Sequence, residues 1–350
     1  LGDIANAENL LLAWREFLPG KKAKRDVQEF SLRLMDNILA LRDDFVNGAY
    51  RHGGYQAFNI SDPKPRNIHK ATVRDRLVHH AIYRVLYPFF DRRFIADSYS
   101  CRNDKGTHRA LDRFRAFFRK VGRNDTRTCW ALKCDIRKFF ANIDHEILLG
   151  ILRGHIDDSG ILSLLAEVIG SFSSTRPGVG LPLGNLTSQL LVNIYMNEFD
   201  RFVKHKLRVK HYLRYADDFI FLSPDRRNLE RLLPEVRAFL RDRLRLELHP
   251  DKVFIETVAS GVDFLGWVHF PDHRVLRTAT KRRIFKRIKE SPTEATLNSY
   301  LGLLVHGNTR KLRAGVYPER IFWLTTLSRL TIQVTSLTPL PFCPKISESL

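Results

Sequence analysis

The sequence predicts an α+β fold for this chain of 350 residues. Several long segments carry apolar residues at helical spacing, whereas shorter apolar runs of strand length are bounded by turn residues. The sequence has no internal repeat at the periods of roughly 20 to 50 residues that mark solenoids and propellers. An apolar content of 44% is enough for a large core, which excludes disorder of the whole chain.

The N-terminal third predicts helices and a hairpin. Residues 9–47 have a helical pattern that is interrupted at the Pro-Gly pair 19–20. The expected buried positions of this segment include Leu32, Met35, Leu39 and Phe45. Residues 50–68 contain Gly-Gly and the turn sequence DPKPR, which together predict a strand, a tight turn and a returning strand. Two further helical patterns cover residues 73–90 and about 106–120.

The middle of the sequence alternates strand-like runs with loops. TCWALKCDI, residues 128–136, is an apolar run of strand length that ends near a carboxylate, Asp135. GVGLPLGN, residues 178–185, predicts a glycine- and proline-rich loop, after which apolar residues from 186 to 202 mark one face of a helix. YLRYADDFIFL, residues 212–222, predicts a strand, a turn and a second strand, with an Asp pair at the turn.

The charge of the chain predicts a polyanionic partner. Its formal net charge is +20, which favours nucleic acid over other ligand classes. Eight Lys or Arg residues lie between positions 274 and 289, with no acidic residue among them. A solvated helix face is the alternative, but like charges at this density repel one another, so we favour a polyanion lying along this segment.

The cysteines and the uncharged segments predict a soluble protein of the reducing cytoplasm. The four cysteines form no CxxC pair, and Cys129 and Cys134 lie in an apolar run that we expect to be buried. This pattern argues against a zinc module or a disulfide framework. No signal-peptide pattern begins the sequence, and the uncharged segment 330–344 is too short and too proline-rich to span a bilayer. We therefore expect no membrane association.

Three aspartates are the candidate catalytic residues. Asp217 and Asp218 lie inside an apolar strand pair, where each charge loses hydration and repels its neighbour unless a cation compensates. Asp135 ends another apolar strand, and three carboxylates from two strand ends suit hard divalent ions such as Mg²⁺. The alternative is that Asp135 caps a strand or helix and that the Asp pair binds a nearby arginine such as Arg214. Together with the net charge, the pattern favours a metal site.

Seven segments, in this order along the chain, resemble the motifs of reverse transcriptases of the bacterial retroelement type. PKPRNI and SYSCRNDKGTHRAL resemble the fingers motifs, and LKCDIRKFF, GLPLGNLTSQLLVNIYMNEFD and YLRYADDFIFL resemble the three palm motifs. LHPDK and VDFLGW resemble the last two palm elements. The resemblance extends from about Tyr50 to Trp267 and implies a right-hand polymerase. Its implied parts are an N-terminal helical extension (1–49), fingers (50–125), palm (126–270), and thumb with C-terminal tail (271–350).

The resemblance also implies roles for individual residues. Asp135 and Asp217 would ligate two Mg²⁺ ions, which Mn²⁺ can replace, with Ile136 as a further metal contact and Asp218 assisting. Such a pair of ions serves nucleotidyl transfer by activating a hydroxyl and stabilising the leaving pyrophosphate. Phe140 would lie beneath the sugar of the incoming nucleotide and exclude a 2′-hydroxyl, which selects deoxynucleotides. Ordinary core packing is the alternative for this residue.

Further implied contacts lie in the fingers, in the loop before the palm helix and in the thumb. Lys64 and Arg66 would neutralise the triphosphate or the template phosphates. Leu183, Gly184 and Gln189 belong to the implied substrate-binding loop and helix. The implied nucleic-acid contacts in the thumb are Arg277, Lys281, Arg282, Arg283, Lys286, His306 and Arg310; for His306 and Arg310, simple surface placement is the alternative.

One departure from the family pattern indicates the subtype. This chain has Pro-Leu-Gly at 182–184, where most reverse transcriptases have Pro-Gln-Gly. A leucine offers only apolar contact where a glutamine can hydrogen-bond near the nascent base pair, so discrimination against mispairs should weaken. LGNLTSQ is similar to the reverse transcriptases of diversity-generating retroelements, which copy an RNA template with frequent errors at adenines. Bacterial defence-associated reverse transcriptases are the alternative setting.

The expected partners follow from this resemblance. They are an RNA template, expected to be a structured noncoding RNA, a DNA or RNA primer, and deoxynucleoside triphosphates. A diversity-generating element would add a small basic helical accessory protein. A maturase-like RNA-binding protein that performs no synthesis is the alternative from another class, and the three intact aspartates argue against it.

Overall fold

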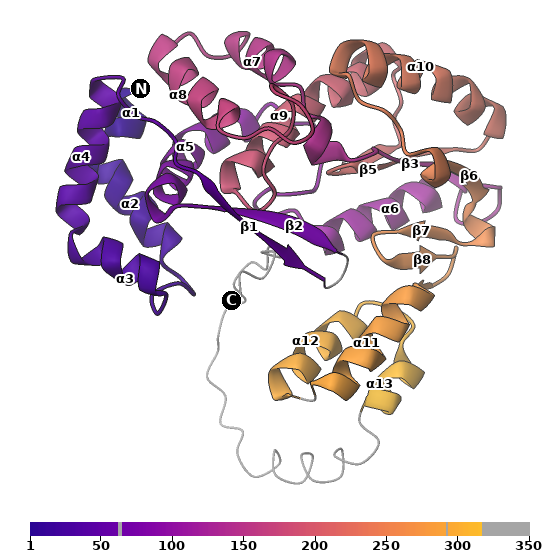
Figure 1. Ribbon diagram of the computed structural model, residues 1–350. Helices are drawn as coiled ribbons and strands as arrows, with labels where there is room; N and C mark the ends of the chain where they lie inside the picture. Colours follow the sequence, from indigo (N-terminus) through magenta and orange to yellow (C-terminus); the bar gives the residue numbers. More distant parts are fainter. Residues whose placement is uncertain (62–64, 292, 317–350) are drawn as a thin grey trace.

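The computed structural model describes residues 1–61, 65–291 and 293–316, and its N-terminal part is a layer of helices. The layer consists of α1 (Gly2–Ala5), α2 (Ala7–Phe17), α3 (Arg25–Leu32) and α4 (Leu34–Val46). Helices α1, α2 and α3 pack against the long helix α5 (Val73–Asp91), and α4 packs against α1, α2 and α3 (Figure 1). The predicted break at 19–20 is confirmed, because α2 ends at Phe17 and a turn follows.

The buried faces of α3, which ends at Leu32, and of α4 differ from the prediction. Phe45 is buried as expected, but Leu32, Met35 and Leu39 are 86%, 50% and 41% exposed. Helix α4 instead buries Ile38 and Leu41 together with Phe45. The apolar residues of this segment cover more than one side of the helix, and only the stripe at 38, 41 and 45 faces the rest of the layer.

An antiparallel hairpin follows the helical layer. β1 (Tyr55–Ile60) pairs with β2 (Arg66–Ala71), with Tyr55 opposite Ala71 and Ile60 opposite Arg66. The predicted strand and returning strand are therefore confirmed, and the residues between them, 62–64, lie outside the described residues. Lys64 is one of these residues.

The central sheet has four antiparallel strands in the order β4-β5-β3-β6. They are β3 (Trp130–Asp135), β4 (Tyr212–Tyr215), β5 (Asp218–Ser223) and β6 (Phe254–Thr257). Alternate side chains of β3 and β5 enter two different core clusters, because successive residues of a strand point to opposite faces. Cys134 and Phe219 face one cluster, whereas Ala131 and Ile220 face the other. Both faces are covered, which explains the nearly continuous apolar runs.

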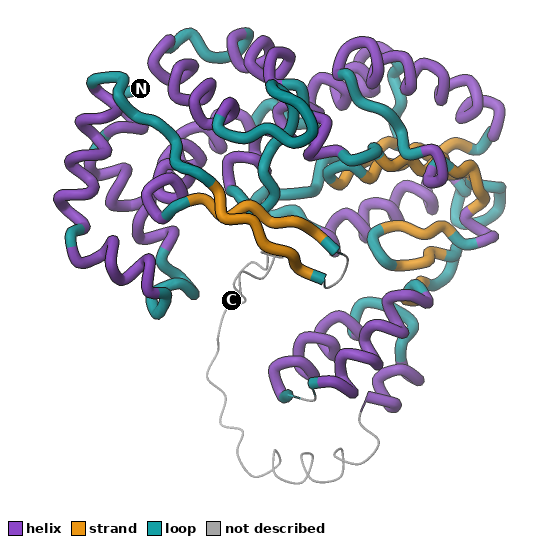
Figure 2. The backbone as a smooth tube through the Cα atoms, in the orientation of Figure 1, coloured by secondary structure: helices purple, strands orange, loops and turns teal. Residues whose placement is uncertain are grey.

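Helices cover both faces of this sheet (Figures 1 and 2). Helices α9 (Leu186–Arg201) and α10 (Arg226–Leu244) contribute to the first cluster, and α6 (Thr107–Val121) contributes to the second. Helix α9 is buried on nearly all sides and not only on the predicted face, because α5, α7 and α10 pack around it. The remaining helices of this part are α7 (His145–Arg153) and α8 (Ser159–Gly170).

The C-terminal part begins with a second small sheet and continues as helices. The sheet consists of β7 (Val262–Phe264), β8 (Trp267–His269) and β9 (Arg274–Leu276). Helices α11 (Thr278–Glu290), α12 (Glu294–Leu304) and α13 (Arg310–Val316) follow it. Over the described part of the chain, no helix has the length and apolar character needed to cross a membrane. The described cysteines, Cys101, Cys129 and Cys134, are free thiols, and Cys129 and Cys134 are buried as predicted.

Candidate active site

The register of the central sheet brings the three predicted aspartates to one end of two neighbouring strands. Asp135 is the last residue of β3 and stands opposite Asp218, the first residue of β5. Asp217 lies in the turn just before Asp218, and its carbonyl accepts a hydrogen bond of 3.2 Å from the Ile136 N–H. Residues that are far apart in the sequence are therefore neighbours, as the apolar runs predicted.

Burial and the neighbouring carboxylates both disfavour the ionised form of Asp217. Burial, followed by the charges of Asp218 and Asp135, raises the pKa of Asp217 to about 6. A carboxyl whose neighbours disfavour its ionised form in this way attracts a cation or a proton. The raised pKa therefore marks a position at which a bound cation would lower the electrostatic energy.

Lys252 supplies one positive charge, which sequence reasoning missed. Its ammonium lies 3.0 Å from Asp135 Oδ1. The lysine ends a short 3₁₀ helix, η3 (Pro250–Lys252), in the LHPDK segment. The neighbouring His249 N–H donates to the Asp135 carbonyl at 2.8 Å, which attaches this segment to the end of β3. The LHPDK segment was the available signal for this lysine. Its partner, Asp135, is more than a hundred residues away in the sequence, so the pairing could not be predicted.

The donor set suits a hard divalent ion, although the side chains do not form a ready coordination shell. Among the described residues, no group of three or more His, Cys, Asp or Glu side chains is arranged to hold a metal ion. Three carboxylates at one strand end are nevertheless the oxygen ligands that Mg²⁺ prefers. Metal binding would require the side chains to turn toward one point, and a metal ion bound through Asp135 Oδ1 would displace Lys252.

Replacing Lys252 by methionine tests this competition. We expect the metal-free variant to lose about 1 kcal/mol or less of stability, because the lysine is 41% exposed and exposed ion pairs contribute little. We expect the rise in Tm on adding Mg²⁺ to be larger than in the unmodified protein, because the ion no longer displaces an ammonium group. Thermal unfolding with and without Mg²⁺ measures both effects. Lys289→Met, at an exposed position of α11, is the control; equal Mg²⁺ shifts in all three proteins would refute the competition.

Arg214 is not the partner of the aspartate pair. Its guanidinium binds the two carboxylate oxygens of Asp200 at 2.8 and 2.7 Å, and both residues are fully buried. The alternative in which Arg214 neutralises Asp217 and Asp218 is therefore wrong. The reason is that Asp200, on the buried helix α9, accepts hydrogen bonds from the Arg214 guanidinium.

The glycine- and proline-rich loop is joined to the hairpin. The Leu183 carbonyl accepts from the His69 N–H, and the Asn185 side-chain amide donates to the His69 carbonyl, both at 3.0 Å. Gly184 has a φ of +104°, and a Cβ built there would lie 2.8 Å from Cγ2 of Ile68. The loop therefore continues the edge of β2 and needs glycine at this position. Sequence reasoning did not single out Asn185, although it immediately precedes α9.

Phe140 and Gln189 lie beside this loop. Phe140 belongs to the 3₁₀ helix η1 (Phe139–Asn142), is half-buried, and packs against the core. Its carbonyl accepts a hydrogen bond of 2.8 Å from the Leu181 N–H. Gln189 is half-buried in the first turns of α9. The segment that follows β3 and the loop before α9 are therefore directly connected.

The predicted phosphate and nucleic-acid contacts differ in their exposure and in their pairing within the chain. Exposed cations include Arg66 at the start of β2, Arg282 and Lys286 on α11, and Arg310 at the start of α13. Three predicted residues are engaged within the chain: Arg277 pairs with Asp263, Lys286 lies 3.7 Å from Glu290, and the His306 ring stacks on His108 at 3.7 Å. Lys281 and Arg283 are half-buried on α11.

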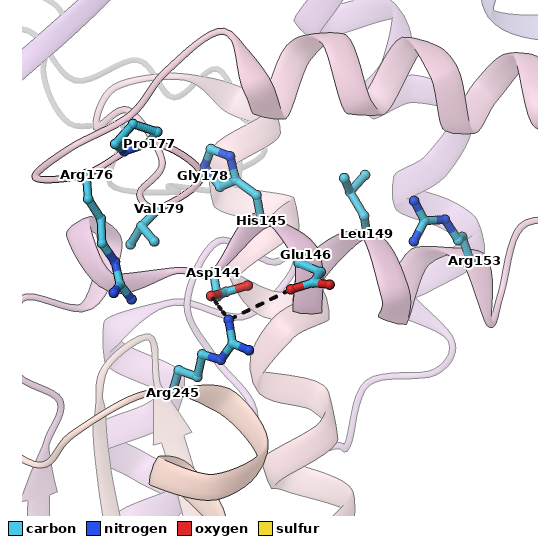
Figure 3. Close-up of a pocket in the computed structure, with 10 residues that line it drawn as sticks. All are labelled: Asp144, His145, Glu146, Leu149, Arg153, Arg176, Pro177, Gly178, Val179 and Arg245. Atoms are coloured by element: carbon cyan, nitrogen blue, oxygen red, sulfur yellow. Dashed lines mark hydrogen bonds and ion pairs between the residues drawn. The ribbon is translucent and has the colours of Figure 1, made fainter.

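A separate cavity lies beside α7 (Figure 3), and Asp135, Asp217 and Asp218 are not among the residues that line it. Its lining residues come from α7 and the residue before it, from the segment 176–179, and from Arg245, which follows α10. Arg245 binds Asp144 at 2.6 Å across it and lies 3.9 Å from Glu146. Burial would raise the pKa of Asp144, but the Ile147 N–H and Arg245 outweigh burial and lower it. This cavity includes none of the predicted site residues.

Comparison with known proteins identifies the class. The chain belongs to the reverse transcriptase (RNA-dependent DNA polymerase) family, whose model matches residues 61–269. This match and the relatives below support RNA-directed DNA polymerase activity, and the mixed helical and antiparallel-sheet architecture is consistent with a right-hand polymerase. Family members generally use divalent metal ions, in keeping with the carboxylate cluster.

Particular relatives add detail. Protein YkfC of Escherichia coli is 27% identical, over 76% of this chain and 78% of that protein. The group II intron-encoded protein LtrA of Lactococcus lactis is 24% identical over 74% of this chain. The matched region covers 51% of LtrA, so this chain spans about half of LtrA's length. A solved structure of apo telomerase from Candida tropicalis has a TM-score of 0.49 and 10% identity, over 63% of this chain and 48% of that chain.

Proposed function

We propose that this protein copies an RNA template into DNA by two-metal nucleotidyl transfer. The observation that carries the proposal is the strand register that sets Asp135 beside Asp217 and Asp218 in a member of the reverse transcriptase family. Asp135 and Asp217 would hold two Mg²⁺ ions, with Ile136 as a further metal contact and Asp218 assisting. Bound there, such ions activate the primer 3′-hydroxyl and stabilise the pyrophosphate leaving group.

The surrounding elements would bind the substrates. In this proposal residues 50–125 are fingers, 126–270 palm and 271–350 thumb with tail, after a helical extension at 1–49. Lys64 and Arg66 would bind phosphates, and Phe140 would exclude a 2′-hydroxyl from beneath the incoming sugar. The exposed cations of α11 and α13 would bind the template–primer duplex, which the net charge of +20 supports.

For the biological setting, we favour an error-prone enzyme of a diversity-generating retroelement. The supporting feature is Leu183, which places an apolar side chain in the loop that precedes α9 and is hydrogen-bonded to β2. The partners would be a structured noncoding RNA, a primer, deoxynucleoside triphosphates and a small basic helical accessory protein. Paired template and variable repeats beside the gene would support this setting, whereas a position in a cluster of antiphage defence genes would favour a defence role.

A maturase-like role is the second candidate, and the relatives favour it. One relative is the group II intron-encoded protein LtrA, and another is the nuclear intron maturase 4 of Arabidopsis thaliana. A protein that only binds RNA has no need for an electrostatically costly aspartate cluster. The raised pKa of Asp217 therefore argues for a role that includes catalysis.

Primer extension on a heteropolymeric RNA, followed by sequencing of the product, tests the proposal. We expect the protein to make DNA with Mg²⁺ and Asp135→Asn to make none while still binding the primed template. Errors concentrated opposite template adenines would support the diversity-generating setting, and faithful products would exclude it. RNA binding without synthesis under Mg²⁺ or Mn²⁺ would favour the maturase-like role.

Replacing Leu183 by glutamine tests the account of the loop. We expect fewer misincorporations, because the new amide can hydrogen-bond near the nascent base pair, while the Mg²⁺ requirement stays the same. The backbone bond between His69 and Leu183 does not involve the side chain, so the loop should keep its place. The error rate per template base is the measurement, with Leu183→Met as a control of similar size. An unchanged error spectrum in the glutamine variant would remove this explanation.

A further inference from the structure

The Arg214 side chain forms a buried network with every donor in use. The Nε–H and one Nη2 N–H donate to Asp200, and the second Nη2 N–H donates to Ser98 Oγ at 3.2 Å. Nη1 donates to Asn193 Oδ1 at 3.3 Å and to the Ala216 carbonyl at 3.1 Å. A guanidinium has five N–H groups, so all of them have acceptors here.

The Ala216 carbonyl is the acceptor that matters for the site. Ala216 has a φ of +55°, in the left-handed region that residues with a Cβ rarely adopt. Its carbonyl belongs to the peptide group that leads directly into Asp217. The following carbonyl, that of Asp217, accepts from the Ile136 N–H. Two successive carbonyls of the turn are therefore held, one by Arg214 and one by the end of β3.

The network is anchored to elements outside the turn. Tyr212 donates its hydroxyl to Asp200 Oδ1 at 2.6 Å, in addition to the guanidinium. The Arg214 backbone is held on both sides, because its N–H donates to the Asp97 carbonyl and its carbonyl accepts from the Tyr99 N–H, both at 2.9 Å. The guanidinium is thus fixed to α9 and to the segment that precedes α6.

Stability alone does not account for this arrangement. Burying an ion pair costs desolvation that the attraction between the charges only roughly offsets, and an apolar replacement is often as stable. The fully buried carboxylate of Asp200 neutralises the charge of Arg214. Its effect on the aspartate cluster is therefore geometric, through the Ala216 carbonyl.

We propose that Arg214, held by Asp200, is a positioning residue that fixes the turn carrying Asp217 and so sets the metal-binding geometry of the site. This inference rests on the proposed function. It predicts that loosening the guanidinium weakens Mg²⁺ binding before it affects binding of the primed template.

Arg214→Lys is the first test, because lysine keeps the charge but has only three donors and no planar fork. We expect the Mg²⁺ concentration for half-maximal extension to rise about tenfold or more, with the dissociation constant of the primed template unchanged. The Tm shift caused by Mg²⁺ without nucleic acid should fall in parallel. Leu240→Ala, in the core of α10, supplies a comparable loss of stability without touching the network.

Ser98→Ala is the second, milder test and decides the question if the lysine variant does not fold. It leaves one Nη2 donor without its acceptor, and we expect a two- to threefold rise in the half-maximal Mg²⁺ concentration. Tyr195→Phe is its control, because it removes one buried hydrogen bond, to the Leu244 carbonyl, elsewhere on α9. Mg²⁺ requirements that follow only the loss of Tm, in variants and controls alike, would overturn the inference. An unmodified protein that shows no Mg²⁺-dependent synthesis would instead overturn the proposed function.

Discussion

Asp217→Asn is expected to abolish primer extension and to raise the stability of the metal-free protein. The first effect follows because an amide cannot replace an anionic metal ligand. The second follows because the fold raises the pKa of Asp217 from 3.8 to about 6, so the ionised carboxylate is destabilising in the folded state. One pKa unit corresponds to about 1.4 kcal/mol, and after allowance for partial exposure we expect a gain of roughly 2 kcal/mol at pH 8.

The pH dependence gives the sign of this effect an independent check. A carboxyl with a raised pKa contributes stability that is fully present below its unfolded pKa of 3.8 and is lost as the pH rises through about 6. The Tm advantage of the asparagine variant should therefore be large at pH 8 and should shrink as the pH falls below 6. Thermal unfolding across this range, without metal, is the measurement.

Asp157→Asn is the matched control, because Asp157 also belongs to an Asp-Asp pair but is exposed. We expect it to leave both extension and Tm nearly unchanged. Mg²⁺ should raise the Tm of the unmodified protein and of the control. The increase in Tm should be much smaller for Asp217→Asn. Residual synthesis by the asparagine variant at near-normal rates would contradict the assignment of Asp217 as a metal ligand.

Gly184→Ala is expected to reduce extension at least tenfold. The added Cβ would meet Ile68 at 2.8 Å, and the φ of +104° is strained for any residue with a side chain. The loop can relieve both only by leaving β2, which would break the bonds between His69 and the residues on either side of Gly184. The effect should appear in kcat/KM for the deoxynucleotide, because the displaced segment belongs to the proposed substrate-binding loop before α9.

Two companion variants separate the causes. Ile68→Ala combined with Gly184→Ala removes the steric contact but not the backbone strain, so we expect only partial recovery. Gly150→Ala is the control, because a Cβ on this glycine of α7 would meet nothing within 4 Å. It should leave activity unchanged and slightly increase stability, since alanine favours a helix interior. Normal kinetics for Gly184→Ala would refute the role given to the loop.

Much of the fold could be predicted from local patterns. Apolar runs of strand length located β3, β4 and β5, and turn residues located the hairpin and the loop before α9. The same patterns predicted that Asp135 and the Asp217–Asp218 pair end neighbouring strands, which the register confirms. Buried faces were harder to predict, as Leu32, Met35 and Leu39 show, because a helix with apolar residues on two sides does not reveal which side a neighbour covers.

The sequence by itself determined several of the helices and strands, the aspartates at the strand ends and the family motifs, because each depends on residues close together in the chain. The tertiary structure alone decided three pairings: Lys252 with Asp135, Arg214 with Asp200, and the loop at Gly184 with β2. Each of these contacts joins two separate elements of the fold. Their formation depends on how helices and sheet pack around one core, which no local pattern of residues specifies.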